Sequence, residues 1–246
     1  GRLGMQRPKD RAAAWNLLEN TCGYKKEHVE GILQQAELTG DFWGESAERW
    51  CSPVPLKIDF PGSKEAVVRV ACGNDHTLAL TERGSVYAWG LGNFGNLGTG
   101  QTTDCWEPTE VKFFTDKPCR AIAAGTKHSI AVTKLGQMYS WGHGGNGRLG
   151  QGESRNASLV PGVIEVKPST LMDYVACGEA HTASIDKTGK IWCWGAGSYG
   201  RLGHGEETDV PVPAKIPSLS GIDFKQVELG TLHSLGLTKK GVIYAW

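Results

Sequence analysis

The feature of this sequence that most constrains its fold is a repeat of roughly 52 residues. Three segments align without gaps, beginning at Ala71, Ala123 and Ala176, and a fourth begins at Glu228. Each contains the pattern Gly-x-x-His-[Thr/Ser], followed by an alternating apolar run, a turn glycine and a tryptophan. A fixed period of this length predicts supersecondary units that stack on one another, because a single unit cannot bury its own apolar face.

Glycine, histidine and tryptophan recur at fixed positions, and we predict a structural role for them. The histidines, like the tryptophans, are separated by 52, 53 and 52 residues. We expect the tryptophans to pack between neighbouring units, where a large ring contributes apolar burial. We expect the histidines to hydrogen-bond a strand to a neighbouring loop. The set comprises Gly73, His76, Trp89, Gly125, His128, Trp141, Gly178, His181, Trp194, Gly230, His233 and Trp246.

Each unit is predicted to contain four short antiparallel strands. In the first unit, 67–71 precedes the histidine and 77–80 follows it, and a turn containing Gly84 leads into 86–89. A proline-led segment at 108–113 suits an outer strand, where proline is tolerated. Four strands in a unit of this length are typical of a propeller blade. The sequence therefore predicts an all-β fold built from β-propeller blades.

The repeat resembles a known family. The pattern Gly-x-x-His-[Thr/Ser], then Trp-Gly and a glycine loop ending Leu-Gly-x-Gly, is similar to the regulator of chromosome condensation repeat, over about residues 53 to 246. The resemblance implies a ring of seven blades. This chain, at 41–246, would supply a partial blade (41–60) and then three full repeats with a truncated fourth (61–246). Seven blades take roughly 360 residues, so we expect a fragment of a longer protein.

Residues 1–40 differ from the repeats and are predicted to form a helical N-terminal extension. An alanine- and leucine-containing stretch at 12–18 suits one short helix. Apolar residues between 28 and 36 lie at helical spacing in a second, which should stop at Thr39-Gly40. We expect this helical hairpin to pack against the propeller or a partner.

Composition narrows the classes of partner and compartment. Lys and Arg together number 26, as do Asp and Glu, so the formal net charge is zero. This balance gives no direct nucleic-acid signal, although it does not exclude a local basic patch. The seven cysteines form no C-x-x-C motif, which favours a reducing intracellular compartment, the cytoplasm or nucleus, or an organelle if a targeting segment lies upstream. No apolar run is long enough to predict a membrane span.

The glycine loops match a dinucleotide fingerprint, but we interpret them as architecture. G-x-G-x-x-G occurs at 90–95, 142–147 and 195–200. A dinucleotide site requires a helix directly after the loop, whereas these loops continue into turn residues and proline. We therefore expect no cofactor. Histidines that fan around an axis cannot converge on one ion, so we expect no metal, and the absence of a G-x-S-x-G elbow leaves no predicted catalytic residue.

The family also includes a plant ultraviolet-B photoreceptor that uses clustered tryptophans. Its Gly-Trp-Arg-His-Thr-like repeats are missing from this sequence. The residues before the four repeat histidines are Asp75, Lys127, Ala180 and Leu232. We therefore do not predict photoreception.

The predicted function is that of a protein-interaction scaffold or a subunit of a larger assembly, because a propeller presents variable loops on a rigid frame. Two alternatives stay open: guanine-nucleotide exchange on a small GTPase, the activity for which the family is named, and a recruiting or regulatory module of a larger enzyme such as a ubiquitin ligase or kinase. Neither requires a catalytic group in this chain. The candidate contact residues at the loop tips are Asn93, Phe94, Asn146, Arg148, Ser198, Tyr199 and Arg201.

Overall fold

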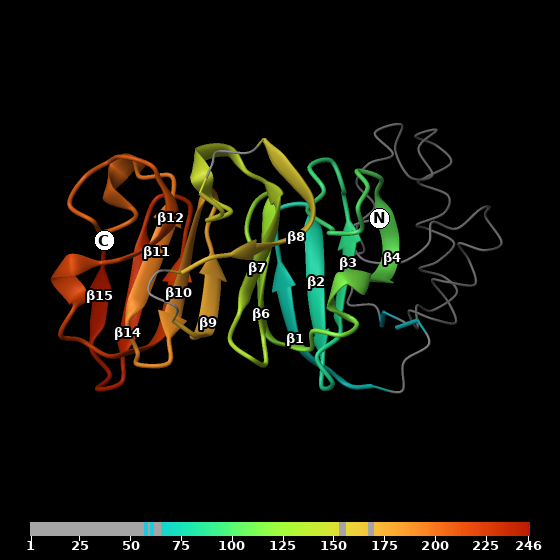
Figure 1. Ribbon diagram of the computed structural model, residues 1–246, viewed down its shortest axis with the longest axis horizontal. Helices are drawn as coiled ribbons and strands as arrows, with labels where there is room; N and C mark the ends of the chain where they lie inside the picture. Colours follow the sequence, from blue (N-terminus) through green and yellow to red (C-terminus); the bar gives the residue numbers. More distant parts are fainter. Residues whose placement is uncertain (1–56, 59, 62–64, 153–155, 167–169) are drawn as a thin grey trace, which may run out of the picture.

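The computed structural model describes residues 57–58, 60–61, 65–152, 156–166 and 170–246 (Figure 1). The predicted helical extension at 1–40 and most of the partial blade at 41–60 lie outside the described residues. No helix in the described part of the chain has the length and apolarity needed to cross a membrane.

The described chain forms successive antiparallel sheets that stand side by side, and in each sheet the strands pair in sequence order (Figure 1). The prediction of all-β propeller blades is therefore confirmed. Blade 1 contains β1 (Val67–Cys72), β2 (His76–Thr81), β3 (Val86–Gly90) and β4 (Cys105–Glu110); blade 2 contains β5 (Cys119–Ala124), β6 (His128–Thr133), β7 (Met138–His143) and β8 (Ala157–Ile164); blade 3 contains β9 (Met172–Cys177), β10 (His181–Asp186), β11 (Ile191–Gly195) and β12 (Val210–Lys215); blade 4 contains β13 (Phe224–Leu229), β14 (Ser234–Thr238) and β15 (Ile243–Ala245).

The outer strand of blade 1 differs from the predicted segment at 108–113. It begins earlier, at Cys105, and ends at Glu110, after which Lys112–Phe114 forms a short 3-10 helix, η2. The chain leaves the sheet here because Phe114 turns inward, 2% exposed, and packs against the ring of Trp141 at a centroid distance of 5.6 Å. The other 3-10 turns are η3 (Gly145–Gly147), η4 (Ser198–Gly200) and η5 (Pro217–Leu219).

A short chain of hydrogen bonds, which we call the blade clasp, joins blade 1 to blade 2. His76 Nε2 lies 2.8 Å from Ser129 Oγ, and that hydroxyl donates to the carbonyl oxygen of Asn96 at 2.8 Å. Because the single hydroxyl proton is used on the carbonyl, Ser129 must accept from His76, which fixes the proton on Nε2. The Trp141 indole donates to the same Asn96 carbonyl at 2.9 Å. The clasp thus runs from blade 1 to blade 2 and back.

The blade clasp recurs at the next two junctions. The participants are His128, Thr182, the Arg148 carbonyl and Trp194 between blades 2 and 3, and His181, Ser234 and the Arg201 carbonyl between blades 3 and 4. The indole nitrogen of Trp89 has no hydrogen-bond partner among the described residues, and neither has that of Trp246, although the Arg201 carbonyl of blade 3 is present at its junction. His233 is exposed. The third junction therefore keeps the histidine–hydroxyl–carbonyl part of the clasp but lacks the indole bond of the first two.

The glycines recur with the histidines and tryptophans because those rings occupy the space beside them. A Cβ atom on Gly73 would overlap the His76 ring and the Gly125 carbonyl oxygen, and the other three Gly-x-x-His pairs have the same overlap with the ring. The Leu-Gly glycine of each loop, such as Gly98, lies against the indole of the next blade's tryptophan, here Trp141. The glycines of these two sets therefore lie against a ring that a larger residue would displace.

The apolar core lies between the blades rather than within one of them. Trp141 and Trp194 are completely buried at the first and second junctions. Phe60, from the segment before blade 1, packs edge-on against Tyr87 at a ring-centroid distance of 4.8 Å. A face of each blade is therefore buried by its neighbour, so the recurring tryptophan is a junction residue.

The clasp histidines are neutral in the folded protein. Burial lowers the pKa of His76 and of His181 to about 4, and it lowers the pKa of His128 well below its usual range. Nδ1 of each of these rings is buried without a hydrogen-bond partner among the described residues. Protonation would therefore bury both a charge and an unpaired N–H group, which is why the neutral form is favoured.

The first prediction concerns the junction tryptophans. Trp141→Ala should lower the free energy of unfolding by about 3–5 kcal/mol, because it removes a fully buried ring and leaves a cavity. Trp106→Ala is the matched control: Trp106 is 38% exposed on β4, and its loss should cost less than about 1 kcal/mol. Urea unfolding measures both. A loss below about 1 kcal/mol for Trp141→Ala would contradict the packing role.

The second prediction concerns pH. The free energy of unfolding should fall as the pH is lowered from 6.5 towards about 4. In this window the unfolded chain binds protons on the clasp histidines and the folded protein does not, so stability rises with pH. Each histidine contributes about 1.4 kcal/mol per pH unit.

Urea unfolding at stepped pH measures this slope. His76→Gln keeps an N–H donor for Ser129 but does not titrate. The free energy of unfolding of this variant should therefore change less steeply with pH, by the contribution of one histidine. An identical slope in the parent and the variant would mean that His76 is not responsible.

Candidate functional site

The loops that follow the third strand of each blade lie together on one side of the molecule, along the upper edge of the view in Figure 1. They are residues 91–104, 144–156 (of which 153–155 are not described) and 196–209. The turns that precede the histidine-bearing strands lie beside them, at 73–75, 125–127, 178–180 and 230–232. We call this surface the glycine-loop face. All seven predicted contact residues lie on it.

A carboxylate closes the base of two of these loops. Asp104 accepts the backbone N–H of Gly92 at 2.9 Å, and Asp209 accepts that of Gly197 at 3.0 Å. Each bond spans twelve residues, so it holds the start of the loop against its end. The loop tips are therefore presented on a fixed base.

Two of the predicted contact residues instead brace the loops. Arg148 and Arg201 are only 7% and 5% exposed. Each guanidinium donates to one carbonyl of its own loop and to one carbonyl of the next blade. The acceptors are Gly145 and Glu179 for Arg148, and Ser198 and Thr231 for Arg201, at 2.8–3.1 Å. Burial removes these side chains from the surface that a partner can reach, which differs from the role expected from sequence.

The tip of the blade 1 loop is covered by packing against blade 2. The Phe94 ring meets the His143 ring edge-on at 4.9 Å between centroids, and Lys127 Nζ lies 4.8 Å from the Phe94 ring centre. Phe94 is therefore half-buried, while the adjacent Asn93 is exposed. The aromatic ring at this tip contributes mainly to the junction between loops.

The tips of the blade 2 and blade 3 loops share an unusual backbone conformation. Asn146 and Tyr199 occupy equivalent positions and have φ of 57° and 62°. Asn146 also donates from its side-chain amide to Asp209 at 2.8 Å, which links the two loops. Asparagine adopts this left-handed region readily, whereas for a tyrosine it costs roughly 1–2 kcal/mol.

Tyr199 is the most prominent side chain of this face. It is 70% exposed, and the exposed Ser198 stands beside it. The guanidinium carbon of Arg201 lies 6.0 Å from the centre of the tyrosine ring. A large aromatic residue is thus held in a strained conformation and turned towards solvent.

Exposed carboxylates lie on the same face as Tyr199. Exposed carboxylates belong to Glu206 and Glu207 of the same loop and to Glu179 of the preceding turn in blade 3. The exposed basic residue Lys127 lies over Phe94. Within the described ranges, no group of three or more His, Cys, Asp or Glu side chains could hold a metal ion. This face presents an exposed aromatic ring and exposed carboxylates.

Comparison with known proteins gives a consistent result. A family profile described as "RCC1-like domain" matches residues 20–246. The ultraviolet-B receptor UVR8 of Arabidopsis thaliana is 38% identical, over all of this chain and 58% of its own length. The human E3 ubiquitin-protein ligase HERC2 is 37% identical over 72% of this chain and 4% of its own length.

A solved structure extends the similarity to three dimensions. Yeast RCC1 (Prp20), solved with Kap60 bound, superposes with a TM-score of 0.65 at 26% identity, covering 76% of this chain and 45% of that one. The chain thus spans less than two thirds of the length of each of these proteins. What they share with it is the blade architecture and the repeat that builds it.

Proposed function

The chain belongs to the RCC1-like domain family, and from that membership we propose that it is a protein-interaction module whose partner binds on the glycine-loop face. The blades give this face a rigid base, since clasps and buried arginines fix the loops from below. Recognition residues in proteins are commonly carried by loops on such a scaffold. The proposal assigns the binding of a macromolecule, rather than a chemical reaction, to this surface.

The exposed, strained Tyr199 is the observation that carries the proposal. Backbone strain of this kind persists where the surrounding structure enforces it, and it clusters at functional positions. Tyrosine is also among the residues that contribute most to binding energy at protein interfaces. The carboxylates of Glu179, Glu206 and Glu207 favour a partner surface that presents basic side chains around the tyrosine contact.

The third prediction uses the equivalent residue of blade 2 as the substitution. Tyr199→Asn should weaken binding to the partner by at least about tenfold, because it removes the anchor. It should leave the free energy of unfolding unchanged or raise it by up to about 1 kcal/mol, because asparagine suits the left-handed conformation. Partners are first captured by the full-length protein and mapped by cross-linking, and the dissociation constant of the mapped partner is then measured for each variant.

Leu135→Ser is the matched control. Leu135 is 83% exposed but lies at the opposite end of the strands, in the turn between β6 and β7. This variant should bind the same partner as the parent protein does. If Tyr199→Asn bound normally while partner cross-links mapped elsewhere, the assignment of this face would be rejected.

Two alternative functions can be tested with the same protein. Nucleotide release from a panel of small GTPases, with and without the protein, tests the exchange activity, and we expect no acceleration. The similarity to a short part of HERC2 shows that related blades occur within a far longer ubiquitin ligase, which favours a recruiting role as a second candidate. In that case, the partner captured through Tyr199 would be modified by the enzyme of which the blades are part.

A further inference from the structure

Although the formal net charge of the chain is zero, a second surface of the molecule differs from the glycine-loop face in the charge of its side chains. The hairpin turns that join the second and third strands lie at the opposite end of the blades from the glycine loops, along the lower edge of Figure 1. They are residues 82–85, 134–137, 187–190 and 239–242. We call this surface the hairpin face.

The tips of the four hairpins are strongly basic. The two residues before each turn glycine are exposed in every blade. These eight positions hold one acidic residue, Glu82, and two uncharged residues, Leu135 and Thr188. The other five are Arg83, Lys134, Lys187, Lys239 and Lys240. Positive charge thus gathers on the face opposite the glycine-loop face, which carries the exposed carboxylates of Glu179, Glu206 and Glu207.

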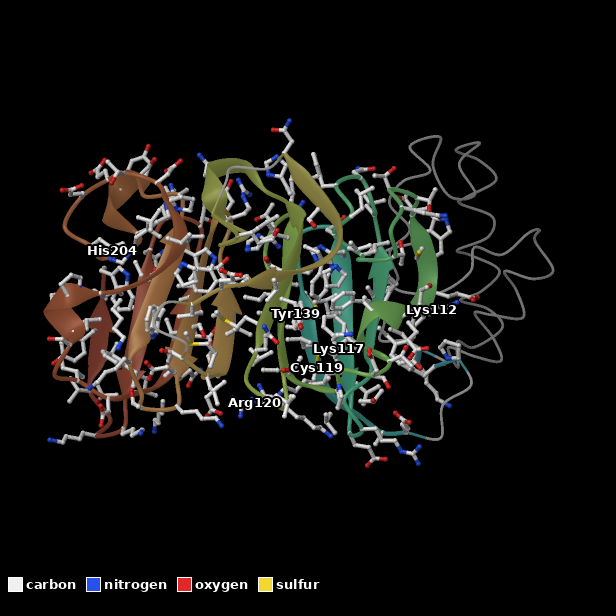
Figure 2. The ribbon with its side chains drawn as sticks, in the orientation of Figure 1. Lys112, Lys117, Cys119, Arg120, Tyr139 and His204 are labelled. Atoms are coloured by element: carbon white, nitrogen blue, oxygen red, sulfur yellow. The ribbon has the colours of Figure 1, made fainter. Side chains whose placement is uncertain are left out.

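Four carboxylates near the hairpin face have basic partners. The ion pairs join Arg83 to Glu65, Lys117 to Asp116, Arg120 to Asp173 and Lys190 to Asp223, with N···O distances of 2.6–3.4 Å. Figure 2 shows Lys117 and Arg120 in the lower half of the view, the half that holds the hairpins. Lys134 donates to the backbone carbonyl of Arg83 at 3.0 Å, which leaves its charge uncompensated. These pairs engage four carboxylates and Arg83, but none of the four lysines at the hairpin tips.

Aliphatic side chains are interleaved with these lysines. Leu135, 83% exposed, adjoins Lys134, and Val242, 51% exposed, follows Lys240 closely. The four turns contain no aromatic residue, whereas binding of single-stranded nucleic acid typically uses aromatic rings that stack on bases. Four of the five basic residues are lysines, which lack the bidentate fork with which arginine recognises phosphate. This composition favours a ligand that offers both carboxylates and apolar groups.

We propose that the hairpin face binds an acidic segment of a protein, in which Asp or Glu residues alternate with aliphatic residues. The carboxylates would pair with the lysines of adjacent blades, and the aliphatic groups would cover Leu135 and Val242. Such a contact is guided by charge and is therefore weakened by salt. It is separate from the site around Tyr199, so the molecule would hold two partners of opposite charge at its two ends.

The fourth prediction tests this with defined probes. The full-length protein is titrated, by fluorescence anisotropy at low and at physiological salt, into a labelled peptide of repeated Glu-Glu-Leu units. A matched peptide of repeated Glu-Glu-Ser units and a short DNA duplex are the comparison ligands. The Glu-Glu-Leu peptide should bind most tightly, and its affinity should fall as salt is raised.

Charge reversal locates the contact. The variant carrying Lys134→Glu, Lys187→Glu and Lys239→Glu should bind the Glu-Glu-Leu peptide at least about tenfold more weakly. Lys127→Glu, a reversal at an exposed lysine of the glycine-loop face, and Tyr199→Asn should bind it as the parent does. The three hairpin side chains are exposed, so the unfolding midpoint should change little, which verifies that the variant is folded.

Three results would overturn the proposal. The first is unchanged peptide affinity in the triple variant. The second is equal affinity for the Glu-Glu-Ser peptide, which would remove the apolar contact. The third is tighter binding of the DNA duplex that is lost in the same triple variant, because the face would then be a nucleic-acid site.

Discussion

The carbonyl oxygen of Asn96 accepts hydrogen bonds from the Ser129 hydroxyl and the Trp141 indole of the next blade. The rest of the architecture depends on this acceptor and on its equivalents at the other junctions. A buried polar group without a partner costs about 1–3 kcal/mol, so removing one blade would strand several groups on its neighbour. The equivalent carbonyl at the third junction accepts from the Ser234 hydroxyl and belongs to Arg201, two residues from Tyr199. The bond that joins blades therefore also fixes the tip on which a partner would bind.

The repeat was sufficient to predict the blades but not the roles of individual loop residues. Glycine, histidine and tryptophan recur because each contacts the same group at every junction, and such contacts are visible as a period in the sequence. Arg148 and Arg201 were placed in the correct loops, but their burial depends on carbonyls of the next blade, which no local pattern reveals. Phe94 and Tyr199 share a position and an aromatic ring, yet only Phe94 is covered by a neighbouring lysine and histidine.

The two ends of the strands have acquired opposite chemistry on one scaffold. At the glycine-loop end the connections are long and variable, and they carry exposed acidic side chains and an exposed aromatic ring. At the hairpin end it is short and basic. Because the glycine loops and the hairpins lie at opposite ends of the blades, charges of opposite sign at the two ends would give the array a dipole that the formal net charge of zero does not reveal. A balanced composition therefore says little about how strongly each surface attracts a charged partner.

The repetition of the clasp has a consequence for how such proteins grow. Each described junction uses the same kinds of group: a histidine, a serine or threonine hydroxyl and a backbone carbonyl. At two of the junctions an indole also donates to that carbonyl. Duplication of one whole unit within a gene would thus create a new junction that is satisfied from the outset. A duplication that ended partway through a unit would instead bury donors that have no acceptor. Selection on the hydrogen bonds alone would favour lengthening in whole repeats.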